Sequence, residues 1–332
     1  MKKYGEYIWP LIGLAAVVGS FYLLYREFEG EASVGAEVWA DLNAISLRHY
    51  LFAAASTLLA YAALAWYDRI ALLHLGVKHI SWAFISLCSF TTYALSHNIG
   101  ASVFSGAMVR YRAYSTKGLS AADVAVLVVL CSFTFGFGNV VLGGLLLTYD
   151  PSLVNRLSGA LPEFLTNTRA GLTIGLSCLG LVLIYIVGSL MHFRPVKLFG
   201  LNIVYPRPEI MLRQLFAAPI ELIGAAGIIY FALPESANVS YLVILGAFLL
   251  SFVVALLSHA PGGLGVFELV FVTVMPDVPR VKILSALLVW RLFYLIIPLL
   301  FALVVVALFE REKLAETLRS RGVARDKQAP GP

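Results

Sequence analysis

The 332-residue chain is 60% apolar and only 13% charged, and its mean hydropathy is +0.86. This composition excludes an ordinary soluble globular domain and indicates a protein whose solvent is largely the lipid bilayer. The net charge of +5 does not indicate nucleic-acid binding, because Lys and Arg gathered on the cytoplasmic side of a membrane protein explain it.

Eight apolar runs are long enough for membrane helices, which need about 20 mostly apolar residues each. They cover residues 8–24, 50–67, 80–96, 121–147, 171–191, 215–233, 241–258 and 283–309. The first run lacks a small-residue cleavage site, so we expect it to remain as a helix. The three cysteines, at 88, 131 and 178, show neither disulfide nor metal-ligand spacing, and we expect no metal or cofactor.

The distribution of basic residues predicts the topology, because short loops rich in Lys and Arg face the cytoplasm. Lys2 and Lys3 place the N-terminus inside. The basic cluster from Arg110 to Lys117 would then face the wrong side after a complete third crossing. The conflict disappears if residues 101–112 form a half-helix that folds back from mid-membrane, since twelve residues span about 18 Å.

A second hairpin is needed at residues 262–275, because the basic tail 310–332 should also be cytoplasmic. The sequence therefore predicts one hairpin, 80–112, that opens to the cytoplasm and another, 241–275, that opens outward. Both should lie inside the protein, where their freed backbone groups find partners.

An internal repeat supports this arrangement. Ser96-His97 and Ser258-His259 end the helix of each predicted hairpin, 162 residues apart. The same shift places the first four apolar runs close to the last four. We therefore expect an all-α polytopic membrane protein with eight transmembrane helices and two re-entrant half-helices. Residues 1–148 and 171–309 form an inverted-topology repeat, as in many transporters.

Three segments resemble a known family. Residues 104–115 contain Arg110-Tyr111-Arg112, residues 258–268 read SHAPGGLGVFE, and residues 290–294 read WRLFY, followed by Pro298. They are similar to the flippase-like transmembrane region of lysylphosphatidylglycerol synthases (MprF) and to the free-standing YbhN-like proteins. The resemblance implies lipid translocation, which in the synthases moves aminoacylated phosphatidylglycerol between leaflets. The synthases also carry an aminoacyltransferase domain, whereas this chain ends 23 residues after its last apolar run, so we expect no lipid synthesis.

The hairpin turns are the predicted headgroup site. Half-helix N-termini near Gly100 and Gly263 would offer backbone N–H groups and a favourable dipole to a lipid phosphate. Gly262, Gly263 and Gly265 would allow close approach of the headgroup, although such glycines also serve tight helix packing.

Charged and aromatic residues complete the predicted site, each with a structural alternative. Arg291 lies deep in its span, and either Glu268 or Glu221 could pair with it, with or without a ligand. Arg110 and Arg112 suit phosphate but could be positive-inside anchors. Tyr111 and Tyr114 could be interfacial belt residues, and His97 and His259 could be helix caps instead of proton carriers.

The candidate headgroup-binding residues are Ser96, His97, Arg110, Tyr111, Arg112, His259, Gly262, Gly263, Gly265, Glu268, Arg291 and Tyr294, and the candidate coupling residues are Glu221, His259 and Glu268. No nucleotide-binding loop, HExxH or nucleophile elbow is present, so no catalytic residues are expected.

The sequence favours a bacterial inner-membrane flippase or transporter for an anionic lipid, with both termini in the cytoplasm. Its expected partners are membrane lipids, and a homo-oligomer is possible. One alternative is an intramembrane enzyme acting on lipid headgroups, which needs His97, His259, Glu268 and Arg291 to converge. The other is a non-transporting scaffold for envelope lipid synthesis that recruits a partner through the tail.

Overall fold

The computed structural model describes residues 34–99, 102–159, 162–192, 196–198, 201–203, 205–234, 237–309 and 311. Within these residues the regular structure is helical apart from one antiparallel pair of short strands, β1 (Val196–Leu198) and β2 (Leu201–Ile203). The predicted helix 8–24 and nearly all of the tail 310–332 lie outside the described residues.

Five described helices are long and apolar enough to cross a membrane. They are α3 (Leu47–His74), α6 (Ala121–Tyr149), α8 (Thr168–Leu190), α9 (Pro208–Ala232) and the helical stretch Arg280–Phe309. All five were predicted as full crossings. The structure thus confirms a helical membrane protein, while the total of eight transmembrane helices stays a prediction.

Shorter elements connect these helices. They are α2 (Val34–Ala44), η1 (Ser115–Lys117), η2 (Pro151–Leu157) and α7 (Glu163–Thr166). None of them was predicted.

The structure corrects two helix boundaries. The sequence predicted that the second helix ends at Tyr67, because Asp68 and Arg69 read as interfacial charges, but α3 continues to His74. Asp68 can lie within the helix because a buried arginine pairs with it. Helix α9 begins at Pro208 instead of residue 215 and includes Pro219 in its interior, which packing among membrane helices tolerates.

The first predicted hairpin consists of α4 (Trp82–Ile99) and α5 (Ser102–Tyr114), which pack against each other. Its two ends lie together, since His79 Nε2 is 3.3 Å from the carbonyl oxygen of Lys117. The guanidinium of Arg69 lies over the Trp82 ring. The hairpin therefore opens toward the C-terminal end of α3.

The second hairpin consists of α10 (Tyr241–Leu257), the 3₁₀ turn η4 (Pro261–Gly263) and α11 (Val266–Val274). At its start, the Tyr241 hydroxyl donates to the carbonyl oxygen of Ile223 on α9. At its end, Arg156 of η2 forms an ion pair with Asp277 at 2.8 Å. This hairpin therefore opens near the C-terminal end of α9 and the α6–α8 connection.

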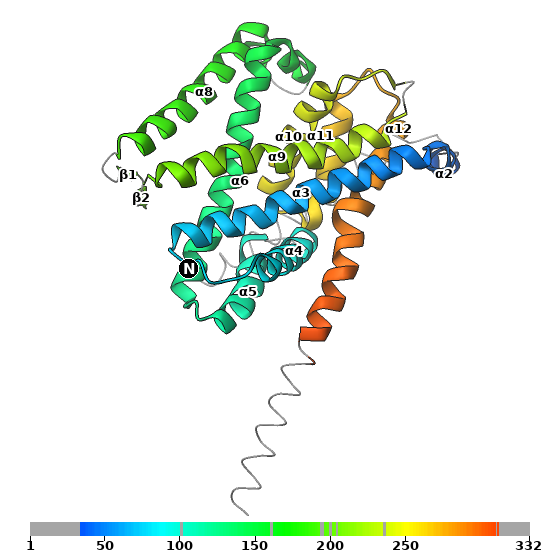
Figure 1. The fold of residues 1–332 in the computed structure, drawn as a ribbon. Coiled ribbons are helices and arrows are strands. Elements are labelled where there is room, and N and C mark those ends of the chain that lie inside the picture. The colour runs from blue at the N-terminus through cyan, green and yellow to red at the C-terminus, as the bar shows by residue number, and fades with distance from the viewer. Residues whose placement is uncertain are drawn as a thin grey trace, which may run out of the picture.

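Helices α3 and α9 form the centre of the molecule and run antiparallel, with α4–α5 on one side and α10–α11 on the other (Figure 1). Arg207, just before α9, donates to the carbonyl oxygen of Leu73 near the end of α3. Gly224 allows close approach, since a Cβ there would lie 2.9 Å from the Ser56 carbonyl oxygen. Because the two helices are antiparallel, the hairpins open toward opposite ends of the molecule.

Helix α8 is the most peripheral of the candidate spans and packs mainly against α6 (Figure 1). Only 17% of its 18-residue apolar window is buried within the protein. Its remaining surface suits direct contact with lipid chains.

Candidate functional site

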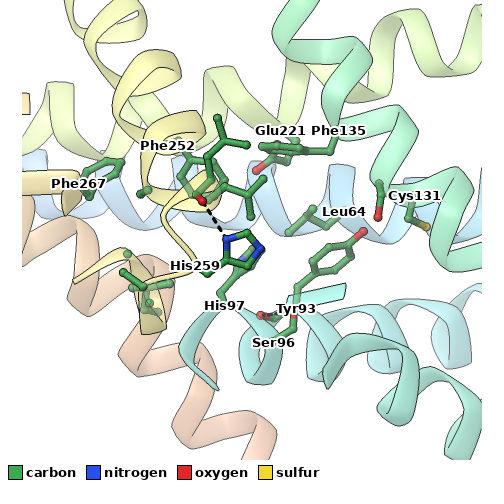
Figure 2. Close-up of a pocket in the computed structure, with 18 of the residues that line it drawn as sticks. Leu64, Tyr93, Ser96, His97, Cys131, Phe135, Glu221, Phe252, His259 and Phe267 are labelled. Atoms are coloured by element: carbon green, nitrogen blue, oxygen red, sulfur yellow. Dashed lines mark hydrogen bonds between the residues drawn. The ribbon is translucent and has the colours of Figure 1, made fainter. Parts of the chain in front are cut away.

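The tips of the two hairpins meet at the centre of the molecule. A Cβ at Gly262 would lie 3.7 Å from the carbonyl oxygen of His97, and Asn98 Nδ2 donates to the carbonyl oxygen of Leu295 at 3.2 Å. A cavity of about 380 Å³, here called the tip cavity, lies beside this junction (Figure 2). Its walls come from both hairpins together with α3, α6, α9 and α12 (Arg280–Arg291).

Aromatic rings form much of the cavity wall. Phe267 and Trp290 stack with ring centroids 4.6 Å apart, and Phe252 meets Trp290 edge-on at 6.4 Å. Phe135 of α6 packs against Phe252 from the opposite side. Such packing gives a rigid apolar wall that can hold a few polar groups in fixed positions.

Several predicted site residues line this cavity together: Ser96, His97, Arg110, Glu221, His259, Gly262 and Gly263. Figure 2 shows Ser96 and His97 on one hairpin opposite His259 on the other. Tyr294 lies next to the cavity, with its ring stacked on that of His97 at 5.5 Å. The structure therefore brings together the two hairpin turns that the sequence singled out.

Tyr111 and Arg112 lie on the outer face of α5. Tyr111 is 46% exposed and Arg112 is also exposed, whereas Arg110 is only 4% exposed. Arg110 and Arg112 were predicted together as headgroup ligands, but residues two positions apart in a helix are about 200° apart around its axis, so they face nearly opposite sides of α5. Only Arg110 faces inward. The alternative that these arginines anchor the protein at the cytoplasmic surface therefore applies only to Arg112.

Arg110 belongs to a buried polar network that the sequence did not reveal. Its guanidinium donates to Asp68 at 2.7 Å, and the Tyr114 hydroxyl donates to the same carboxylate at 2.9 Å. The guanidinium also lies over the Tyr93 ring at 4.8 Å. Asp68 and Tyr114 are fully buried, so Tyr114 is not an interfacial belt residue.

Arg291 and Glu268 form the second buried pair, as one of the two predicted pairings expected. Arg291 Nε donates to Glu268 at 2.5 Å, and Arg291 Nη1 donates to the Gly262 carbonyl oxygen at 3.0 Å. Through its bond to Gly262, Arg291 connects the pair to the second hairpin turn and stabilises the turn.

The three turn glycines have φ values of +59°, +63° and +76° at Gly262, Gly263 and Gly265. These left-handed conformations favour glycine, so backbone geometry, more than helix packing alone, accounts for the residue type. The N–H of Gly265 donates to the Glu268 carboxylate at 2.9 Å. A carboxylate of the protein thus already caps the α11 N-terminus, which was predicted to attract a lipid phosphate.

Glu221 is fully buried on α9 and is not the partner of Arg291. Tyr294 donates to its carboxylate at 2.6 Å, and the Tyr67 hydroxyl lies 3.5 Å from its second oxygen. Tyr61 in turn donates to the Tyr294 carbonyl oxygen.

The C-terminal span changes geometry within the site. Helix α12 ends at Arg291, and a π-helical turn, Leu292–Ile296, follows before the span continues to Phe309. Trp290 and Arg291 lie at the end of α12 just before this turn, and Tyr294 lies within it. Such π-helical turns frequently mark functional positions.

His259 adopts φ +56°, and its Nδ1 lies 2.8 Å from the carbonyl oxygen of Leu257. This contact, drawn in Figure 2, agrees with the capping alternative. Three other polar atoms near the tips are buried without a hydrogen-bond partner in the described structure, namely Trp290 Nε1, His97 Nδ1 and Arg291 Nη2. Searched over the described residues, no three His, Cys, Asp or Glu side chains group as metal ligands.

This geometry defines a polytopic helical membrane protein with an internal cavity at the junction of two hairpins. The chain belongs to the family of the lysylphosphatidylglycerol synthase transmembrane region, whose family model matches residues 10–302.

Two relatives match most of the chain. It is 31% identical to the uncharacterized protein slr0712 of Synechocystis over 264 residues, which cover 79% of this chain and 80% of the relative. It is 29% identical to the inner membrane protein YbhN of Escherichia coli over 295 residues, covering 87% and 88%. A phosphatidylglycerol lysyltransferase of Staphylococcus haemolyticus matches at 32% over 87 residues, which are 25% of this chain and 10% of that enzyme.

Proposed function

We propose that this protein moves a lipid between the leaflets of the membrane and holds its anionic headgroup in the tip cavity. The observation that carries the proposal is the set of buried polar atoms without partners at the hairpin tips. Trp290 Nε1 is a donor only, and Trp290 and His97 both line the cavity. A phosphate ester offers acceptor oxygens to the Trp290 N–H, and leaving this buried donor unpaired is unfavourable.

The cavity mouth suits a lipid better than a free phosphate. Leu256 and Leu257 line the cavity and are 44% and 68% exposed, and the neighbouring His259 is exposed as well. An apolar rim lets the acyl chains stay in the bilayer while the headgroup enters.

The opposed hairpins support access to the cavity from either side of the membrane. They open toward opposite ends of the central α3–α9 pair, and the cavity lies where their tips meet. If residues 1–148 and 171–309 are inverted repeats, small rocking motions would expose this cavity to either side in turn.

We further propose that the protein resides in the bacterial inner membrane with both termini in the cytoplasm. The relative YbhN is named an inner membrane protein. Arg69, Lys117 and Arg207 lie toward the end of the molecule where α3 ends and α9 begins, and such a cluster favours the cytoplasmic side.

Catalysis is not part of the proposal. The enzyme alternative required His97, His259, Glu268 and Arg291 to converge, but Glu268 and Arg291 pair with each other behind the hairpin turn. The scaffold alternative depends on the tail, nearly all of which lies outside the described residues.

Leaflet exchange in proteoliposomes tests the proposal. Fluorescent phosphatidylglycerol and phosphatidylcholine probes are followed by quenching the outer leaflet, with wild type, Trp290→Phe and protein-free vesicles side by side. Trp290→Phe keeps a ring against Phe267 and removes the N–H, whereas Trp39→Phe changes a tryptophan that is 68% exposed on α2.

We expect wild type and Trp39→Phe to accelerate exchange of the anionic probe. Trp290→Phe should slow it about 10-fold or more, since a hydrogen bond to a charged group contributes about 1.5–3 kcal/mol. Equal exchange with and without folded protein, for every probe, would contradict the function.

A further inference from the structure

Glu221 differs from the other buried carboxylates of the described helices because no basic side chain there pairs with it. Asp68 pairs with Arg110 and Glu268 pairs with Arg291. Glu221 is 1% exposed and forms no ion pair within the described residues. Its hydrogen-bond partners are the two phenols of Tyr67 and Tyr294.

An ionised carboxylate with only neutral partners is unfavourable inside a membrane protein. Protonation removes the charge, and the surrounding hydrogen bonds allow it. The Tyr294 hydroxyl can donate to Oε1 in either state. When Oε2 carries a proton, it can donate to the Tyr67 oxygen, while Tyr67 donates to the carbonyl oxygen of Ala218 at 3.3 Å.

Among the described residues that line the cavity, Glu221 is the one with a carboxyl side chain. Titratable or charged side chains reach the cavity or this network from α3, α4, α5, α6, the π-helical turn and the second hairpin. They are Tyr61, Tyr67, Tyr93, His97, Arg110, Cys131, Tyr294 and His259. Of these only Arg110 carries a fixed charge, and Asp68 balances it.

We propose that Glu221 is a proton-binding site that couples lipid movement to the proton gradient. Glu221 lines the tip cavity (Figure 2), so the proposed headgroup would lie beside it. An anionic headgroup there disfavours the ionised carboxylate through like-charge repulsion, so the lipid and one proton bind together. The cavity that holds both the lipid and the proton carries one negative charge fewer than the cavity that holds the lipid beside an ionised Glu221. The inference rests on the proposed lipid transport.

The test uses the full-length protein in proteoliposomes with the anionic phosphatidylglycerol probe, an entrapped pH indicator and a clamped membrane potential. Exchange is compared at symmetric pH, under a one-unit pH gradient and under a sodium gradient. The variants are Glu221→Gln, which keeps an oxygen acceptor for Tyr294, and Glu163→Gln, which changes an exposed carboxylate on α7. Infrared difference spectra on acidification, in vesicles without the probe, detect the protonated carboxyl directly.

We expect the pH gradient to shift the wild-type leaflet distribution by up to about tenfold, the limit for one proton per lipid. Glu163→Gln should respond equally, while Glu221→Gln, whatever its basal exchange rate, should not respond to the gradient and should lack one carboxyl band. Wild-type exchange that ignores the pH gradient or follows sodium would overturn the coupling and leave the transport function standing. A full response in Glu221→Gln, or an unchanged carboxyl band, would also overturn it. No exchange for folded wild type in any condition would instead remove the transport function and the coupling with it.

Discussion

Removing Arg110 should destabilise the protein far more than removing Arg112, although both arginines lie on α5. Arg110 is 4% exposed and pairs with the fully buried Asp68 at 2.7 Å. Arg110→Met leaves that carboxylate with the Tyr114 hydroxyl at 2.9 Å and the more distant Cys131 thiol at 3.5 Å. Neither group carries a compensating positive charge.

The expected loss follows from this geometry. Breaking a buried ion pair by removing one partner costs about 3–5 kcal/mol, whereas replacing both partners with apolar residues is often close to neutral. The double variant Asp68→Leu/Arg110→Met should therefore be more stable than either single variant. It still leaves the Tyr114 hydroxyl without its acceptor, which costs about 1–3 kcal/mol. The coupling energy of the cycle should then exceed roughly 3 kcal/mol.

Reversible denaturation of the purified protein in mixed detergent micelles measures these free energies of unfolding. Arg112→Met is the matched control because Arg112 is exposed on the same helix, and it should change stability by less than about 0.5 kcal/mol. A loss below about 1 kcal/mol for Arg110→Met, or a double variant as unstable as the two singles added together, would refute this account of the pair.

Three further predictions can be checked by the same unfolding measurement. Gly138→Ala should destabilise the protein by about 1–3 kcal/mol, because the new Cβ would lie 2.7 Å from that of Ala218. In the control Gly136→Ala the new Cβ meets no atom within 4 Å, so this change should be neutral or slightly stabilising. Equal effects of the two changes would contradict this packing. Gly262→Ala should cost about 1–2 kcal/mol, because its φ is +59°, and a neutral result would argue against the turn conformation. Asp277→Asn should change stability by less than about 1 kcal/mol, because Asp277 is 69% exposed in its pair with Arg156; a larger loss would show that this pair is structural.

Much of the fold could be predicted because membrane helices follow composition closely. The apolar runs gave the order of the described long helices, and the position of the basic residues required the two chain reversals. Helix α5 begins at Ser102, one residue from the predicted start of the first half-helix. Glu268 and Glu221 were predicted as the two possible partners of Arg291, because a deep arginine needs a nearby carboxylate, and the structure pairs it with Glu268.

The Asp68–Arg110 network escaped prediction for a physical reason. Asp68 follows an apolar run and precedes Arg69, so it resembled the interfacial end of a helix. Only the packing of α5 against α3 brings Arg110, 42 positions later, beside it. The helical periodicity of α5 offered one usable signal, because Arg110 and Tyr114 are four residues apart and share a face.

The π-helical turn and the glycine conformations also depend on tertiary structure. Nothing local in residues 292–296 distinguishes a π turn from a continuous α-helix, although Tyr294, which donates to Glu221, lies within this turn. The glycines at the second tip signalled a turn. Their capping by Glu268 became visible only once α11 and α12 were placed together.

Photo-crosslinking tests most directly whether a headgroup occupies the tip cavity. Phosphatidylglycerol with a photoreactive group in its headgroup is incorporated around the reconstituted protein, and the labelled peptides are mapped by mass spectrometry. The same lipid with the group at the end of an acyl chain serves as the control. We predict headgroup adducts around residues 93–97 and 256–263, with acyl-chain adducts on the exposed faces of α8 and of residues 300–308. Headgroup adducts confined to the helix ends and absent from the cavity segments would contradict the account.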